Sequence, residues 1–313
     1  MTVLVCSDSA LAAYNFGPSH PFGPWRLEAF LSACHRQGLD HRYQTYPARQ
    51  AGNAELLSFH TPAYVERVRT AEADGLAWLD QGDTPVFHGI FEAASRVVGT
   101  TVEGVNRILA GQAQRVFTPI AGLHHARRDA AAGFCVFNDA GVAIECLRRE
   151  HGLQRIAYVD IDAHHGDGVF YAFEADPDVF IVDFHEDGRF LYPGTGRAEE
   201  TGRGEARGTK CNRPLPMDAN DVDFARIWPE CLGFLRAARP EFVLLQCGAD
   251  SLAGDPITHL AFTHRVHAQV TRDLCRLADD FCDGRLLAMG GGGYNPDNIG
   301  AAWSAVVRSL LEA

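Results

Sequence analysis

Paired cysteines, long apolar runs and positive charge are all scarce in this 313-residue sequence. Its nine cysteines are an odd number, include no C-x-x-C pair and mostly fall in apolar stretches, so we interpret them as reduced core thiols rather than disulfides or zinc ligands. No run of 18 apolar residues occurs, and residues 1–10 have no basic segment before their short apolar run. We therefore expect a cytoplasmic protein that is neither secreted nor membrane-spanning.

The shortage of positive charge bears on the partners. Lysine and arginine total 28 against 40 aspartates and glutamates, which gives a formal net charge of -12. This balance argues against a phosphate-binding surface, and so against nucleic acid as a partner, but it is compatible with cationic ligands. The glycine run at residues 290–293 also lacks the Lys/Thr ending and the G-x-G-x-x-G spacing of phosphate-binding loops.

No internal repeat, low-complexity tract or linker interrupts the chain, so we expect one domain over residues 1–313. Apolar runs alternate with stretches of helical spacing, which predicts an α/β fold whose mainly parallel sheet is covered by helices on both faces. We predict strands at residues 2–6, 115–120, 155–159, 179–184, 241–246 and 285–289. We predict helices from about residue 24 and at residues 61–74, 86–110, 138–150, 168–175, 222–239, 263–280 and 298–311, where the stretch 86–110 is long enough for one helix or two.

Polar or glycine-rich clusters follow five of the predicted strands. Because the carboxyl ends of parallel strands share one edge of a sheet, these clusters predict a single site. The clusters are Leu123-His124-His125, Asp160-Ile161-Asp162, Asp183-Phe184-His185, Cys247 to Asp250 and Gly290 to Tyr294.

The densest cluster lies at residues 158–168, where three carboxylates and two imidazoles follow a buried strand. Such groups repel one another or resist desolvation unless a cation or hydrogen bonds hold them, so a metal is the simplest explanation. Asp162 and His164 point to the same side of an extended segment, while Asp160 suits a supporting role behind a neighbouring histidine. Asp250 is the best placed third ligand, and two aspartates with one histidine leave a position open for water, which fits catalytic zinc or Fe(II).

Two plainer interpretations stay open at this point. The cluster at residues 158–168 is also compatible with a polar loop that caps a helix, with Asp167 as the N-cap. Asp250 is also compatible with a turn former in the stretch that runs to Pro256.

Other side chains at the same edge suit a hydrolytic reaction. The adjacent His124 and His125 point in different directions, so at least one faces the site, where it can move a proton from water to a leaving amine. Tyr294 can donate a hydrogen bond to a polarised carbonyl and to the oxyanion it becomes. Phe134 and Tyr192 are either walls of a slot for an aliphatic chain or plain loop anchors, and their spacing does not decide between the two.

Together these segments resemble the arginase-related deacetylase superfamily of histone deacetylases, acetoin-utilisation proteins and acetylpolyamine amidohydrolases. The resemblance runs from about Tyr14 to Trp303 and implies a single α/β domain with an eight-stranded, mainly parallel sheet. The motifs that carry it, in the family's order, are Gly122 to Ala126, Gly133 to Asp139, Asp160 to Gly168, Tyr192 to Gly196, Gly248 to Asp250 with Gly254 to Pro256, and Gly290 to Asn295.

The resemblance also implies roles for individual residues. For the chemistry it implies zinc on Asp162, His164 and Asp250, an electrostatic pair of His124 with Asp160, a general base and acid in His125 with Asp167, and carbonyl polarisation by Tyr294. For the substrate it implies a tunnel along Gly133, Phe134 and Tyr192, a rim aspartate in Asp83, and an inner cavity for departing acetate at Arg26. It further implies a monovalent cation, K+ or Na+, held around Asp160, Asp162, His164, Asp183 and Phe184.

The sequence departs from the family at positions that concern the ligands. Leu123 stands where many relatives have Trp, so a roomier inner cavity and acyl groups larger than acetyl come into question. Ile257 stands where a polyamine-selective relative has an acidic residue, which weakens the polyamine hypothesis. The stretch 210–216 lacks the usual aromatic and apolar residues, which weighs against a second cation site. Tyr294 is not replaced by the histidine of a weakly active subclass.

We therefore expect a zinc-dependent deacylase that releases acetate, or another acyl group, from acylated lysine in proteins. The alternative within the same class is a deacetylase of acetylpolyamines or another small acylated amine. The alternative from another class is a catalytically silent binder of acyl-lysine, which the intact histidines and Tyr294 disfavour. The sequence does not indicate the oligomeric state.

Overall fold

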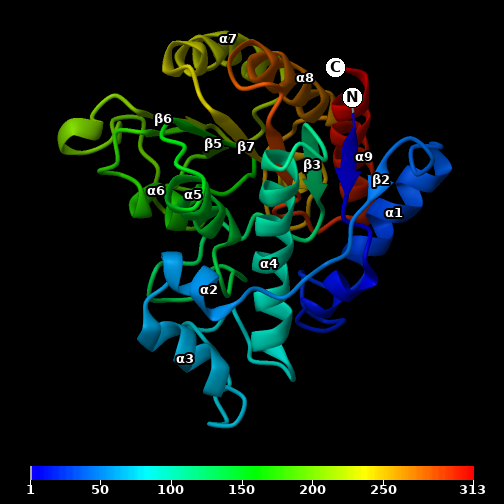
Figure 1. The fold of residues 1–313 in the computed structure, drawn as a ribbon, viewed down its shortest axis with the longest axis vertical. Helices are drawn as coiled ribbons and strands as arrows, with labels where there is room; N and C mark the ends of the chain where they lie inside the picture. Colours follow the sequence, from blue (N-terminus) through cyan, green and yellow to red (C-terminus); the bar gives the residue numbers. More distant parts are fainter. Residues whose placement is uncertain (1) are drawn as a thin grey trace.

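The computed structural model describes residues 2–313, so Met1, the first residue of the expected domain, lies outside it. Eight strands in this range form one sheet in the order β2-β1-β3-β8-β7-β4-β5-β6, and every neighbouring pair is parallel (Figure 1). The predicted α/β fold with a parallel eight-stranded sheet is confirmed. The strands are β1 (Val3–Val5), β2 (Gln44–Thr45), β3 (Arg115–Thr118), β4 (Ile156–Asp160), β5 (Val179–Glu186), β6 (Lys210–Leu215), β7 (Phe242–Gln246) and β8 (Leu286–Met289).

Helices cover both faces of this sheet. α7, α8 and α9 lie side by side along one face with α1 against α9, while α2, α4 and α5 pack together on the other (Figure 1). Because both faces are covered, the central strands are nearly continuous apolar runs, and all residues of β4 and β7 are buried. The helices are α1 (Arg26–Arg36), α2 (Asn53–Phe59), α3 (Pro62–Thr70), α4 (Ile90–Leu109), α5 (Asp139–Arg149), α6 (Asp167–Ala172), α7 (Asp221–Ala238), α8 (His264–Phe281) and α9 (Pro296–Glu312).

The two strands that the sequence pattern does not predict lie at the edges of the sheet. β2 has two residues, both exposed, and so carries no apolar pattern. β6 contains Asn212 and Pro214 and pairs with β5 alone, and proline is tolerated in such an edge strand because its missing N–H is not needed there. The pattern also does not predict α2, and the helix expected over 61–74 ends at Thr70, ahead of a turn closed by Gly75 with φ 67.

The buried apolar side chains form one continuous cluster that includes residues from both helical layers. The nine cysteines of residues 2–313 are all free thiols and eight of them are buried, as the sequence indicated. Within the same range, the helices are too short or too polar to cross a membrane.

The packing of α4 provides a test of this fold. Gly99 lies against a neighbouring segment, and a Cβ atom there would sit 2.4 Å from both Arg49 O and Ala51 N. Because backbone atoms cannot easily move aside, we expect Gly99→Ala to lower the free energy of unfolding by about 1–3 kcal/mol. A Cβ at Gly233 in α7 meets nothing within 4 Å, so Gly233→Ala is the control and should stabilise by up to about 1 kcal/mol. Thermal unfolding followed by circular dichroism measures both, and equal melting temperatures would contradict this packing.

Candidate active site

Four neighbouring strands bring functional side chains to one edge of the sheet. The carboxyl ends of β3, β8, β7 and β4 lie next to one another in that order, so the loops that follow them converge. These loops carry His124 and His125 after β3, Asp162 and His164 after β4, Asp250 after β7, and Tyr294 after β8.

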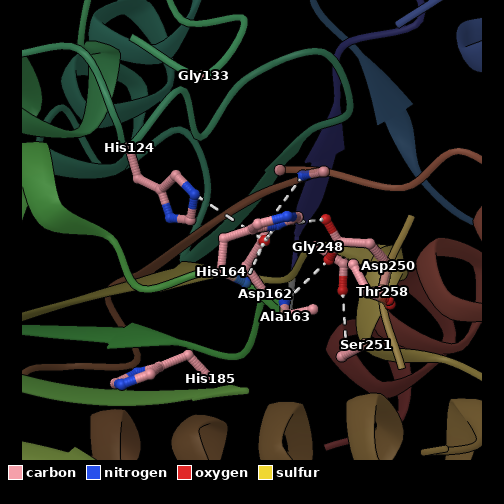
Figure 2. Close-up of polar contacts among 12 residues, drawn as sticks. His124, Gly133, Asp162, Ala163, His164, His185, Gly248, Asp250, Ser251 and Thr258 are labelled. Carbon is pink, nitrogen blue, oxygen red and sulfur yellow. Dashed lines mark hydrogen bonds and ion pairs between the residues drawn. The ribbon is translucent and has the colours of Figure 1, made fainter. Parts of the chain in front are cut away.

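The predicted metal ligands Asp162, His164 and Asp250 are brought together, with ligand atoms within 4.8 Å of one another. His164 Nδ1 lies 3.0 Å from Asp162 Oδ1 and 3.2 Å from Asp250 Oδ2, and all three side chains are buried (Figure 2). Asp250 Oδ2 is shielded from solvent and accepts no hydrogen bond from any group of residues 2–313. Two carboxylates and an imidazole that face one another in this way fit a divalent cation such as zinc.

Two glycines allow the backbone to approach the ligand carboxylates. A Cβ at Gly248 would sit 2.1 Å from Asp162 Oδ2, and a Cβ at Gly292 would sit 2.1 Å from Asp250 Oδ2. The Gly292 N–H also donates to Asp162 Oδ2 at 2.8 Å. A side chain at either position would displace a ligand, so the close approach to the carboxylates requires glycine at both positions.

His124 and His125 are each backed by a buried carboxylate. His124 Nδ1 lies 2.8 Å from Asp160 Oδ2, and His125 Nδ1 lies 2.7 Å from Asp167 Oδ1. The two Nε2 atoms are 3.1 Å apart, and His124 Nε2 is 3.9 Å from Asp162 Oδ1. Each carboxylate therefore fixes which ring nitrogen is directed to the site.

The same contacts separate the pKa values of the two histidines. Burial alone would lower the pKa of His124, but Asp160 and Asp162 outweigh it and raise that pKa to about 10. Burial, reinforced by the charge of His124, lowers the pKa of His125 to about 4. In this arrangement His124 is positively charged at neutral pH, while His125 is neutral and can accept a proton.

Sequence reasoning missed two polar residues that hold these groups in place. Gln246, the last residue of β7, donates through Nε2 to Asp162 Oδ2 at 2.8 Å and to Gly122 O at 3.2 Å. Asp139 accepts the backbone N–H groups of Gly122 and Leu123 at 3.0 and 2.8 Å. A glutamine that ends an apolar strand was the available signal for Gln246. Asp139 belongs to the motif Gly133 to Asp139 that carried the resemblance, but no role in the site was assigned to it there.

Asn138 connects the turn that carries His124 and His125 to a segment that is far away in the sequence. Its side-chain amide donates to His124 O at 3.2 Å and to Ala126 O at 2.8 Å. Its backbone N–H donates to His60 Nε2 at 2.9 Å, across 78 residues of sequence. Burial lowers the pKa of His60 to about 4, so its ring is neutral at pH 7 and Nε2 is free to accept this bond.

Phe134 and Tyr192 stand beside the catalytic candidates. Phe134 packs edge-on against Tyr294 with ring centroids 5.8 Å apart, and Tyr192 packs edge-on against His125 at 5.1 Å. Gly133 lies between them, since a Cβ there would sit 2.6 Å from His125 and 3.0 Å from Tyr192. Tyr192 is 43% exposed, so these rings flank the entrance from solvent.

A cavity of about 20 Å³ lies against the ligands Asp162 and His164, with Phe22, Leu123 and Tyr294 also in its lining. It has room for about one water molecule. Arg26 lies behind it, with its guanidinium 3.8 Å over the ring of Phe22 and hydrogen bonds to Gly291 O and Gly293 O. A roomier inner cavity behind Leu123 stays a prediction.

Asp83 and Ile257 are not part of that cavity lining. Asp83 is exposed next to Thr84, whose Oγ1 accepts the Phe134 N–H at 3.2 Å, so it lies beside the entrance. Ile257 is half-buried, and its N–H donates to Asp255 Oδ1 at 3.1 Å. Their roles toward a substrate also stay predictions.

The residues expected to hold a monovalent cation lie on two neighbouring segments. Asp160 and Asp183 face each other directly across β4 and β5, and both are buried. Asp183 also accepts the Gly166 N–H at 2.9 Å and lies 2.7 Å from His185 Nδ1. The remaining members, Asp162, His164 and Phe184, follow on the same two segments. Neighbouring buried carboxylates fit a bound cation, but its presence stays a prediction.

The model of the histone deacetylase domain matches this chain over residues 20–310, a range that contains every predicted site residue. The chain belongs to the histone deacetylase family. Acetoin utilization protein AcuC of Bacillus subtilis is 36% identical over 95% of this chain and 77% of its own length. Histone deacetylase B of Dictyostelium discoideum is 34% identical over 95% of this chain and 71% of its own. Histone deacetylase RPD3 of Saccharomyces cerevisiae is 32% identical over 95% and 69%.

These similarities confirm the family that the ordered motifs indicated. As a member of the histone deacetylase family, the protein is a hydrolase of that type. The group Asp162, His164 and Asp250 is its candidate metal site.

The ligand geometry predicts how metal binding responds to mutation. We expect Asp250→Ala to weaken Zn2+ binding by more than about 100-fold, because losing even an outer partner of a ligand costs about 10–100-fold. Zinc retained after dialysis against a competing chelator, measured by elemental analysis, tests this. Cys146, Glu150 and His151 form a second group of possible ligands on and after α5, so Glu150→Ala is the control and should retain zinc. Loss of zinc from Glu150→Ala together with retention of zinc by Asp250→Ala would instead indicate that the metal binds at Cys146, Glu150 and His151.

The link from His60 to Asn138 predicts a pH dependence of stability. The folded-state pKa of His60 is about 4, below its usual value of 6.5, so its contribution is complete above pH 6.5 and is lost as the pH falls towards 4. We expect the melting temperature of wild type to fall more steeply over this window than that of His60→Gln. The same change at the exposed His41 should leave the slope as in wild type. Parallel slopes for all three proteins would contradict the prediction.

Proposed function

We propose that the protein is a zinc-dependent amidohydrolase that removes acetyl or other acyl groups from acylated lysine side chains. The observation that supports this best is the convergence of three metal ligands, two carboxylate-backed histidines and Tyr294 at one edge of the sheet. Asp162, His164 and Asp250 would hold the zinc, which when bound polarises the acyl carbonyl and lowers the pKa of water. Fe2+ is the other ion that this ligand set suits.

His125 suits the role of general base and then general acid. Its Nδ1 is engaged by Asp167, so Nε2 is directed to the site, and its low pKa keeps it neutral at pH 7. A neutral Nε2 can take a proton from the attacking water and return it to the leaving amine. His124, charged through its contact with Asp160, would stabilise the negative charge that develops beside it.

Tyr294 suits the role of hydrogen-bond donor to the acyl oxygen. Its backbone N–H donates to Asp255 Oδ2 at 2.9 Å, and its ring packs against Phe134, so its position is fixed from two sides. Burial, with Asp250 and Asp162 nearby, raises the pKa of the phenol well above its ordinary value. The hydroxyl therefore stays protonated at neutral pH and can donate to the developing oxyanion.

The entrance suits a substrate with a slender aliphatic arm that ends in the acylated amine. Phe134 and Tyr192 would contact that arm, and the exposed Asp83 could accept backbone N–H groups of a peptide at the rim. The net charge of -12 favours basic substrates. We place the reaction in the cytoplasm, where nine reduced thiols persist.

A small acylated amine is the alternative substrate, because the metal ligands, the two histidines and Tyr294 would act on the acylated amine group whether or not it belongs to a protein. Acetate release from an acetyl-lysine peptide and from N-acetylputrescine, measured in parallel with zinc-loaded protein, separates the two. A higher kcat/KM for the peptide supports a protein substrate, and a higher value for the amine supports the alternative.

Further assignments belong to the same proposal. Leu123 would set the depth available to the acyl group, Ile257 would exclude a second amine rather than bind it, and Arg26 would accompany departing acetate. A K+ or Na+ ion between Asp160 and Asp183 would offset their buried charge.

The role given to Tyr294 is tested by Tyr294→Phe, which keeps the ring and removes the donor. We expect kcat to fall by about 10²–10³-fold, as for loss of one oxyanion donor, while zinc stays bound. Tyr43→Phe, at a partly buried tyrosine outside the site, is the control and should keep full turnover. Acetate release and zinc content are measured for each variant, and unchanged turnover in Tyr294→Phe would exclude this role.

A further inference from the structure

Lys210 is the only lysine in the chain, although lysine and arginine together number 28. It is the first residue of the edge strand β6, and it is buried with 2% of its surface exposed. Arginine is planar and broad, whereas the ammonium of lysine is a compact point charge. A chain that uses arginine everywhere else and lysine at one buried position indicates that this position needs the compact cation.

The ammonium group of Lys210 is surrounded by neutral oxygens. Nζ donates to Asp176 O at 2.9 Å, to Val179 O at 2.5 Å and to Thr209 Oγ1 at 2.8 Å. An ammonium has three N–H donors, so all of them are used. Backbone carbonyls and a hydroxyl around a single positive charge are also the ligands that proteins offer to K+.

The three oxygens are held in place by contacts that do not involve Lys210. The Thr209 hydroxyl donates to Ala206 O at 2.7 Å, so a lone pair of its oxygen is left for the ammonium. The Asp176 carboxylate pairs with Arg148 of α5, and this pair holds residue 176 in place while its backbone carbonyl accepts from the lysine. Val179 is the first residue of β5. The cage is therefore expected to persist when the lysine side chain is removed.

Burial disfavours the positive charge of Lys210, which lies in the cage formed by Asp176 O, Val179 O and Thr209 Oγ1. It lowers the pKa of the Lys210 amine to about 7, and the nearby Glu174 counteracts part of that effect. Converging carbonyl dipoles without a cation between them would be equally unfavourable in a site shielded from water. The ammonium and the cage thus stabilise each other.

We propose that the Lys210 ammonium is a tethered monovalent cation, filling a neutral-oxygen site that would otherwise take a free ion such as K+ or NH4+. It fastens the turn between α6 and β5 to the edge strand β6. α6 begins with Asp167, which pairs with His125, so the tether steadies a segment that supports the site. With this cation built into the chain, the cage needs none from solution.

Lys210→Ala opens the cage and tests the proposal. In N-methylglucamine chloride, whose cation is too large to enter, we expect the melting temperature to fall by on the order of 5 °C. Replacing that salt by KCl or NH4Cl at equal ionic strength should restore more than half of the loss, saturably, while LiCl should not. Wild type is measured in the same salts, so an effect of the proposed ion at Asp160 and Asp183 is common to both proteins and is subtracted.

Lys210→Met is the matched control, since it fills the apolar path of the side chain without supplying charge. We expect it to be destabilised and to recover no more in KCl than wild type does. Recovery of Lys210→Ala no greater than that of Lys210→Met would overturn the proposal. So would a melting temperature of Lys210→Ala equal to that of wild type in every salt.

A measurement on wild type decides the matter if the variants fail to fold. Because the chain has one lysine, labelling with ¹⁵N-lysine gives a single Nζ signal. At about pH 6, below the amine's pKa of about 7, we expect an ammonium signal in slow exchange with water that does not shift when KCl replaces N-methylglucamine chloride. A rapidly exchanging amine, or a signal displaced by K+, would show that the cage does not hold the lysine.

Discussion

Seven aspartates are buried at or beside the carboxyl edge of one parallel sheet, and the architecture around them follows from that charge. They are Asp139, Asp160, Asp162, Asp167, Asp183, Asp250 and Asp255. An unpaired buried carboxylate costs several kcal/mol, so each needs a dedicated partner. Asp160, Asp167 and Asp183 each contact a histidine, while Asp139 and Asp255 each accept two backbone N–H groups. Asp162 and Asp250 share His164 between them, and Asp250 Oδ2 accepts no hydrogen bond within residues 2–313, so one buried carboxylate oxygen at the candidate metal site stays without a donor.

Pairing at such close range requires the chain itself to come near the carboxylates. Gly248 and Gly292 occupy positions where any Cβ would overlap a ligand oxygen, and Gly166 fits between Asp160 and Asp183. Glycines at this edge therefore help to stabilise the buried charges, since they allow backbone N–H groups and neighbouring strands to approach the carboxylates closely. The supporting bonds from Gln246 and Asn138 then fix the directions in which the charged groups point. A rigid constellation of this kind favours differential stabilisation of a transition state, because little reorganisation is left to occur during reaction.

The same principle operates with opposite sign at Lys210. There the buried charge is a cation, and neutral oxygens rather than carboxylates surround it. Asp160 and Asp183 lie on β4 and β5 and Lys210 lies on β6, while Asp250 follows β7 and the two histidines follow β3. Matching of buried charge to fixed dipoles therefore extends across the sheet from β6 to β3.

Local patterns in the sequence determined the central strands, most helices and the set of residues that meet at the site, because apolar runs, caps and polar strand ends are properties of a few consecutive residues. They also indicated the family, through the order of motifs such as Gly122 to Ala126 and Asp160 to Gly168. The sequence pattern did not predict the edge strands β2 and β6, since strands with exposed or polar faces carry no apolar signal. The resemblance also implied which histidine meets which aspartate. Tertiary structure alone decided that Gln246 and His60 support the site, and that two carbonyls and a hydroxyl surround Lys210. Those contacts join segments that are far apart in the chain, so they follow from the packing of the whole sheet rather than from any local run of residues.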